Sequence, residues 1–140
     1  MQDLPPILVA EDDEDDFAFL MRAVRHAGIQ NPLLRFRDGA ELIKFLEQIP
    51  TAEMGPAAHC PWLLLLDITM PVVNGFEVLK WLKTHRGLPE VRPVMLSGSY
   101  RPDDIDRAMG LGAVDYLVKP VTPIVAAAIA ARQFIPTLQT

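Results

Sequence analysis

Short apolar runs alternate along the chain with longer stretches in which apolar residues recur at helical spacing. The runs predict five strands, at 7–10, 33–37, 62–66, 93–96 and 114–118, and a helix is expected after each of them. Strands and helices that alternate in this way build βα units on a parallel sheet, so the pattern predicts an α/β fold of five units. The unbroken run at 62–66 indicates a central strand that is covered on both faces. Arg35 and Arg37 alternate with apolar residues in the second run, which indicates an edge strand.

The stretches between the strands carry the usual signals of helices. Asp38 and Thr122 are expected as N-caps, and the third and fourth helices are expected from about Gly75 and Pro102. The segment 50–61 contains several helix breakers and is expected to be a surface connector. The expected inward faces consist of Phe17, Leu20, Met21 and Val24 in the first helix, Leu42, Phe45, Leu46 and Ile49 in the second, and Ile105, Ala108 and Met109 in the fourth.

The length and charge of the chain indicate its domain organisation and a candidate cation site. The 140 residues are expected to form a single domain that spans 1–140, and half of them are hydrophobic, which is enough for a substantial core. The formal net charge is −5, but six of the eighteen acidic residues stand together at 11–16. The other twelve nearly balance the thirteen basic residues, so the acidity is local. Because this block directly follows the first apolar run, it indicates a cation site.

The composition argues against several classes of function. Nucleic-acid binding is not expected, because no broad cluster of Lys and Arg is present to neutralise phosphates. The apolar runs fall far short of the roughly 20 residues that span a bilayer, and the first residues lack the charged start of a signal peptide, so a cytoplasmic protein is expected. Cys60 is the only cysteine, which excludes an internal disulfide and a thiolate metal cluster.

Polar residues with related chemistry stand at the ends of four of the expected strands. They are Glu11 and Asp12 after the first strand, Asp67 after the third, Ser97 after the fourth and Lys119 after the fifth. The carboxyl ends of parallel strands share one edge of a doubly wound sheet, so these side chains are expected to meet. Carboxylates about 4 Å apart repel by roughly 4 kcal/mol at an effective dielectric near 20, and they therefore require a cation. Oxygen ligands without His or Cys favour Mg²⁺, with Mn²⁺ as the alternative.

These residue types suit phosphoryl transfer, which depends mainly on positioning and charge neutralisation. Asp67 can act as the nucleophile toward phosphorus, while Lys119 supplies a fixed positive charge and Ser97 a hydroxyl donor. An isolated aspartate after a strand is more often a cap, but the other strand ends favour the nucleophile. Tyr116 alone is equally well an ordinary edge-strand aromatic.

Several segments of the chain resemble, in order and spacing, the motifs of the response regulator receiver family. They are ILVAEDD at 7–13, LLLLDITMP at 63–71 with the later Gly75, VMLSG at 94–98 and DYLVKP at 115–120. The resemblance covers nearly the whole chain. It implies a doubly wound, flavodoxin-like (βα)₅ fold with the strand order 2-1-3-4-5.

The resemblance also implies the ligands of a metal ion. Asp67 would be the phosphoacceptor, and Asp12 and Asp67 would ligate Mg²⁺ together with the backbone carbonyl of Thr69. Glu11 would take part through a water molecule.

Further roles follow from the same resemblance. Lys119 would contact the phosphoryl group, and the peptide bond before Pro120 would be cis. Ser97 stands where receivers more often have threonine, and it would form the switch together with Tyr116.

The function that the resemblance implies is that of a stand-alone response regulator in a two-component phosphorelay. Such a protein is a phosphoacceptor in signalling rather than an enzyme. A sensor histidine kinase or a histidine phosphotransfer protein would be the donor, and a downstream protein would read the surface of the fourth helix, fifth strand and fifth helix. The acidic start and the long connector are similar to those of regulators that are paired with bacterial phytochrome-type kinases. Homodimerisation through the fifth-strand side is also expected.

Three other interpretations are weaker. A haloacid-dehalogenase-like phosphatase needs a second aspartate where this chain has Thr69. In a flavodoxin-like cofactor carrier, acidic residues after the first strand would repel the flavin phosphate. A calcium loop needs glycine where this chain has Phe17. The acidic residues 13–16 are expected to be only a solvated helix start, because carboxylates are favourable there.

Overall fold

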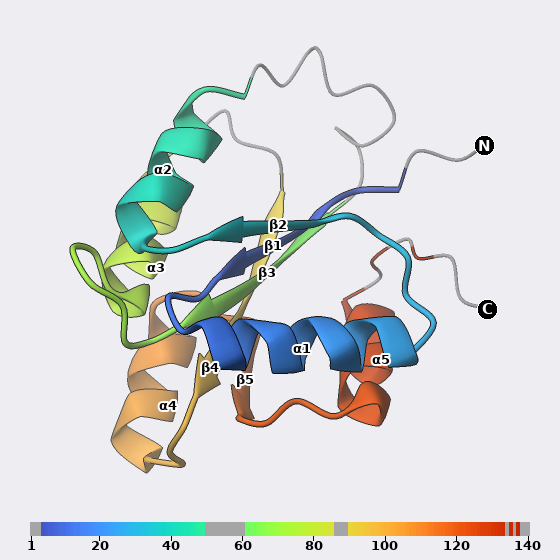
Figure 1. Ribbon diagram of the computed structural model, residues 1–140. Helices are drawn as coiled ribbons and strands as arrows, with labels where there is room; N and C mark the ends of the chain where they lie inside the picture. The colour runs from blue at the N-terminus through green and yellow to red at the C-terminus, as the bar shows by residue number, and fades with distance from the viewer. Residues whose placement is uncertain (1–3, 50–60, 86–89, 134, 136, 138–140) are drawn as a thin grey trace.

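The computed structural model describes residues 4–49, 61–85, 90–133, 135 and 137, in which five strands and five helices alternate (Figure 1). The strands are β1 (Ile7–Ala10), β2 (Leu33–Phe36), β3 (Trp62–Asp67), β4 (Val91–Ser97) and β5 (Asp115–Val118). The helices are α1 (Glu14–His26), α2 (Gly39–Glu47), α3 (Gly75–Thr84), α4 (Pro102–Gly110) and α5 (Pro123–Arg132). All strand pairs are parallel and the order is β2-β1-β3-β4-β5, which confirms the predicted doubly wound (βα)₅ fold.

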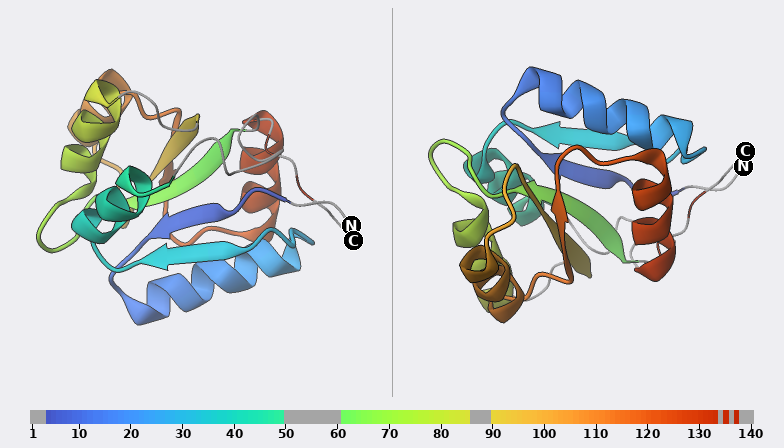
Figure 2. Two further views of the ribbon diagram at one scale, coloured as in Figure 1. Left: turned by 90° about the horizontal axis from the view of Figure 1, so that it is seen from above. Right: turned by 90° about the horizontal axis from the view of Figure 1, so that it is seen from below.

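The helices cover both faces of the sheet. Helices α1 and α5 contact each other on one face, while α2, α3 and α4 form a contiguous layer on the other (Figure 2). Strand β3 lies in the middle and is buried at all six positions, as the unbroken apolar run predicts. Strand β2 lies at an edge, as predicted from its alternating arginines.

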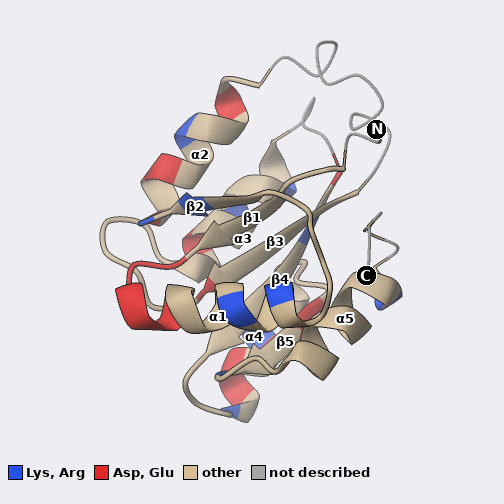
Figure 3. Ribbon diagram, turned by 45° about the vertical axis from the view of Figure 1, so that its right-hand side comes forward, with Lys and Arg blue, Asp and Glu red and all other residues tan. Residues whose placement is uncertain are grey.

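Local signals set where the helices begin. The side chain of Asp13 caps α1 by accepting from the Asp16 N–H at 2.8 Å, and further acidic residues fill the first turn, where they suit the helix dipole (Figure 3). Asp38 and Thr122 cap α2 and α5 as predicted. At α3, Asn74 and Glu77 form a reciprocal capping box. The start of α1 is thereby fixed directly behind β1.

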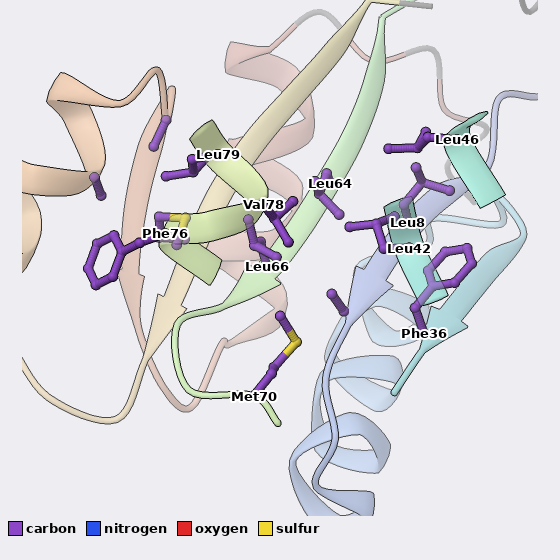
Figure 4. Packing of buried hydrophobic residues seen from close by; sticks show 14 of the residues in the cluster. Leu8, Phe36, Leu42, Leu46, Leu64, Leu66, Met70, Phe76, Val78 and Leu79 are labelled. Carbon is purple, nitrogen blue, oxygen red and sulfur yellow. The ribbon is translucent and has the colours of Figure 1, made fainter. Parts of the chain in front are cut away.

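Two hydrophobic clusters hold these layers together, one on each face of the sheet. Figure 4 shows the cluster beneath α2 and α3, where Leu8, Leu64 and Leu66 project from the sheet toward the helices. Leu42 and Val78 meet them from the helices and are fully buried. The second cluster lies under α1 and α5. Burial of this kind contributes about 25 cal/mol per Å² of apolar surface, and it fixes the strand ends in space.

Two predicted core residues and several bounds differ in the structure. The prediction that Met21 and Met109 face inward was wrong, since they are 41% and 45% exposed. Each follows a buried residue, Leu20 or Ala108, and the rotation of about 100° per residue carries it off the narrow buried stripe. Strand β4 begins two residues earlier than predicted because Val91 pairs with Trp62.

Other bounds shift by a single residue. Strand β2 ends at Phe36 and β5 begins at Asp115. Apart from Pro61, the predicted connector at 50–61 lies outside the described residues. Among the helices that are described, none combines the length and the apolar character needed to cross a membrane.

Candidate functional site

The carboxyl ends of β1 and β3 bring three carboxylates together. Glu11 and Asp12 follow β1, and Asp67 is the last residue of β3. One carboxylate oxygen of each lies within 4.8 Å of the others, so the predicted convergence is found. Asp12 is exposed while the other two are buried, which leaves the cluster open to solvent on one side.

Lys119 enters this cluster from the end of β5. Its Nζ lies 2.6 Å from Glu11 Oε1 and 3.2 Å from Asp67 Oδ2. The Lys119 N–H donates to the Ser97 carbonyl at 2.8 Å, which holds the chain beside β4, and the bond to Pro120 is cis as predicted. Burial lowers the pKa of Lys119, but its hydrogen bonds to Glu11 and Asp16 outweigh burial and raise the pKa above its ordinary value. The ammonium is therefore a permanent charge.

Glu11 is almost completely buried, with 1% of its surface exposed. Burial raises its pKa to about 8, and a hydrogen bond with Asp67 adds to the shift while Lys119 opposes it. Its Oε2 atom has no hydrogen-bond partner among the described residues. A buried acceptor without a donor is costly, and a cation is one way to satisfy it.

The donor set fits a divalent cation. Three carboxylates face one another, and Lys119 alone does not balance their charge. The side-chain donors of the group are all oxygen atoms, which suit Mg²⁺ or Mn²⁺. The acidic cluster is thus compatible with Mg²⁺ binding, and the individual ligand roles stay predictions.

The loop that follows Asp67 is held tightly. Asp67 Oδ1 accepts the Thr69 N–H at 3.3 Å, and the Gly75 N–H donates to the Ile68 carbonyl at 2.9 Å. A Cβ atom on Gly75 would lie 2.5 Å from the Asp67 carbonyl oxygen, so only glycine fits here. The described contact of Thr69 uses its N–H. The metal role of its carbonyl stays a prediction.

Ser97 and Tyr116 are linked through Ser99. Ser97 is buried, and its Oγ accepts the Ser99 N–H at 3.1 Å. The Tyr116 hydroxyl donates to the Ser99 carbonyl at 3.3 Å. One residue of the β4–α4 loop therefore contacts both predicted switch residues, which no pattern in the sequence indicated.

Two further residues at the site were missed or misread from the sequence. The acidic residues 13–16 do form the helix start that was expected, with Asp13 as its cap, but Asp16 Oδ2 lies 2.9 Å from Lys119 Nζ, so Asp16 is more than a solvated residue. Its place in the first turn of the helix that directly follows the end of β1 was the available signal. Arg35, predicted only as an edge-strand residue, reaches from β2 to the loop after β1.

Comparison with known proteins decides the family. The model of the response regulator receiver domain matches residues 7–130 of this chain. The chain belongs to the response regulator receiver family. Receiver domains are signalling components of two-component systems and bind Mg²⁺, so the predicted family and class of function are confirmed.

Individual relatives support this assignment. Response regulator Rcp1 of Synechocystis sp. is 32% identical over 117 residues, which make up 82% of this chain and 78% of that protein. A probable cyclic di-GMP phosphodiesterase of Vibrio cholerae is 31% identical over 124 residues. This receiver chain covers 87% of its own length there but spans only 25% of that protein.

Solved structures agree with the fold and with the predicted subgroup. The bacteriophytochrome response regulator RtBRR has a TM-score of 0.77 and 32% identity, over 95% of this chain and 80% of that one. The bacteriophytochrome response regulator AtBRR has the same TM-score and 28% identity, over 96% of both chains. The predicted similarity to phytochrome-associated regulators is therefore confirmed, and the phosphatase and cofactor-carrier alternatives lose their support.

Proposed function

We propose that this receiver accepts a phosphoryl group on Asp67 from a sensor histidine kinase or a histidine phosphotransfer protein. The observation that carries the proposal is the position of Asp67, whose carboxylate contacts the Lys119 ammonium at 3.2 Å and shares a cluster with two other carboxylates. A nucleophile for phosphorus and groups that neutralise a phosphoryl charge are thus side by side.

The transfer itself exchanges one bond for another. A carboxylate oxygen of Asp67 attacks phosphorus while the bond between phosphorus and the donor's imidazole nitrogen breaks, and the imidazole keeps the electron pair and takes up a proton. Lys119 is placed to hold one phosphoryl oxygen. When bound by Asp12, Asp67 and the Thr69 carbonyl, with Glu11 acting through water, Mg²⁺ or Mn²⁺ would neutralise the charge on the phosphoryl oxygens.

The proposed output is a change in the surface formed by α4, β5 and α5. Phosphorylation replaces about one negative charge with about two, and the added oxygens need donors. Ser97 can supply one with its hydroxyl hydrogen, because its described bond to the Ser99 N–H uses Oγ only as an acceptor. Because Ser99 also holds the Tyr116 hydroxyl, a movement of Ser97 toward Asp67 would loosen Tyr116 and bias the surface that surrounds it.

The partners follow from this proposal. A histidine kinase or phosphotransfer protein would meet the open side of the acidic cluster in the cytoplasm, and a downstream protein would read the α4–β5–α5 surface. Neither a nucleic acid nor a membrane belongs to the proposed partners. Homodimerisation through the β5 side stays a prediction.

The test is chemical. Incubation with acetyl phosphate and Mg²⁺ should give an acid-stable, base-labile phosphate in the wild-type protein and none in Asp67→Asn. Asp106→Asn on the exposed face of α4 is the matched control and should be phosphorylated like the wild type. A phosphate that persists in Asp67→Asn would contradict the proposal. A phosphotransfer screen against the histidine kinases of the source organism would then identify the donor.

A further inference from the structure

Arg35 joins the edge of the sheet to the loop that carries the acidic pair. It pairs with Val9 in the register of β1 and β2, and its side chain is only 14% exposed. Its Nε donates to the Glu11 carbonyl oxygen at 3.1 Å, and one terminal nitrogen donates to the Asp12 carbonyl oxygen at 3.4 Å. The two residues whose carboxylates face Asp67 therefore have their backbone held by a single guanidinium.

Other contacts fix the guanidinium in turn. Its second terminal nitrogen forms an ion pair with Glu14 Oε1 at 3.0 Å. Its Cζ atom lies over the Phe17 ring, 4.7 Å from the ring centroid. Both partners belong to the beginning of α1, so Arg35 ties the end of β1 to the start of α1. Because these contacts hold the Arg35 guanidinium on several sides, it favours one conformation of the loop after β1.

The loop needs such a donor because β1 ends just before it. The Glu11 N–H still pairs with the Phe36 carbonyl at 2.9 Å, but the carbonyl groups of Glu11 and Asp12 lie beyond the strand and receive side-chain donors instead. The planar fork of arginine can serve two carbonyls and one carboxylate at once. The compact ammonium of a lysine cannot span the same three acceptors.

We propose that Arg35 is a positioning residue, which orients the carboxylates of Glu11 and Asp12 for a divalent cation. This inference rests on the proposed metal-dependent function of the site. Arg35 would touch neither the cation nor the phosphoryl group, and it would act through the backbone of the two acidic residues.

Arg37 offers a matched control in the same strand region. It pairs with the same Glu14 carboxylate, but its side chain is 61% exposed. A purely electrostatic role and a positioning role predict opposite changes in cation affinity when Arg35 is replaced. Removal of a positive charge near an acidic site should tighten cation binding, whereas release of the loop should weaken it.

The experiment measures Mg²⁺ binding by calorimetry to unphosphorylated wild-type protein, Arg35→Gln, Arg35→Lys and Arg37→Gln. We expect both Arg35 variants to bind Mg²⁺ about tenfold more weakly, and Arg37→Gln to bind as tightly as the wild type or slightly more tightly. If Arg35→Gln does not fold, Arg35→Lys, which keeps the charge and the long stem, decides alone. Wild-type or tighter binding in the folded Arg35 variants would overturn the proposal, as would an equal loss in Arg37→Gln.

A second readout separates positioning from a merely structural role. The Mg²⁺ concentration for half-maximal phosphorylation by acetyl phosphate should rise in the Arg35 variants by the same factor, while the rate at saturating Mg²⁺ changes by less than about twofold. A purely structural role would lower the unfolding temperature and leave the half-maximal concentration unchanged. If the wild type binds Mg²⁺ with the expected dependence on Arg35 but forms no phosphate on Asp67, the proposed function fails and the role of Arg35 stands.

Discussion

Lys119 Nζ lies 2.9 Å from Asp16 Oδ2 while it also contacts the two buried carboxylates of Glu11 and Asp67. The Asp16 side chain is 46% exposed and belongs to the first turn of α1, so it is the one partner of the three that can turn away without leaving a buried charge. In the unphosphorylated protein, Asp16 therefore competes with Asp67 for the ammonium that a phosphoryl group would need.

The first prediction concerns this competition. Asp16→Asn should raise the rate of phosphorylation by acetyl phosphate about two- to fivefold, the factor that corresponds to the roughly 0.5–1 kcal/mol of a partly exposed ion pair. Asp15→Asn removes the same charge from the same pocket and is the control. An equal increase in both variants would mean that charge alone, rather than competition for Lys119, limits the rate.

The second prediction concerns repulsion within the cluster. In the presence of a chelator, Asp67→Asn should be more stable than the wild type by about 1 kcal/mol, because it removes one of three carboxylates that share a single ammonium. Urea unfolding at a pH above about 8, where Glu11 is ionised, measures the difference. Saturating Mg²⁺ should erase or reverse it, since the wild type binds the cation more tightly. A destabilised Asp67→Asn in chelator would contradict this account of the cluster.

The third prediction concerns pH and Glu11, whose pKa is raised from 4.5 to about 8 by burial and by Asp67. A carboxyl with a raised pKa holds its proton more tightly in the folded state. Its contribution to the free energy of unfolding is therefore complete below pH 4.5 and is lost as the pH rises through about 8. In chelator, Glu11→Gln should gain stability relative to the wild type between these pH values, as followed by thermal unfolding. A constant difference across that range would show that Glu11 does not titrate there.

Much of the fold could be predicted from local patterns. The apolar runs indicated each strand, and the topology of a parallel sheet alone brings residues such as Glu11, Asp67 and Lys119 to one edge. Prediction failed where a side chain's surroundings depend on the packing of distant elements. Met21 has the spacing of a buried residue, but the buried face of α1 is narrower than its apolar stripe.

The contacts of Asp16 and Arg35 show the same limit at the site. Lys119 stands 103 residues from Asp16, and Arg35 stands 24 residues from Glu11. Such pairs are fixed by how the strand ends meet and by which rotamer a long side chain adopts. A sequence read segment by segment contains neither. The meeting of the carboxylates of Glu11, Asp12 and Asp67 could therefore be predicted, whereas the contacts of Asp16 and Arg35 could not.

The fourth prediction concerns the loop after Asp67. Gly75→Ala should destabilise the protein by about 1–3 kcal/mol, because the new Cβ would lie 2.5 Å from the Asp67 carbonyl oxygen and a backbone atom cannot move aside cheaply. The displaced Asp67 should also be phosphorylated more slowly by acetyl phosphate. Gly110→Ala is the control, since nothing lies within 4 Å of its added Cβ, and near the end of α4 it should be neutral or slightly stabilising. Chemical unfolding and the phosphorylation rate are measured on both variants. A Gly75→Ala variant with the stability and the phosphorylation rate of the wild type would show that the added Cβ fits in the loop. That result would contradict the tight placement of Asp67.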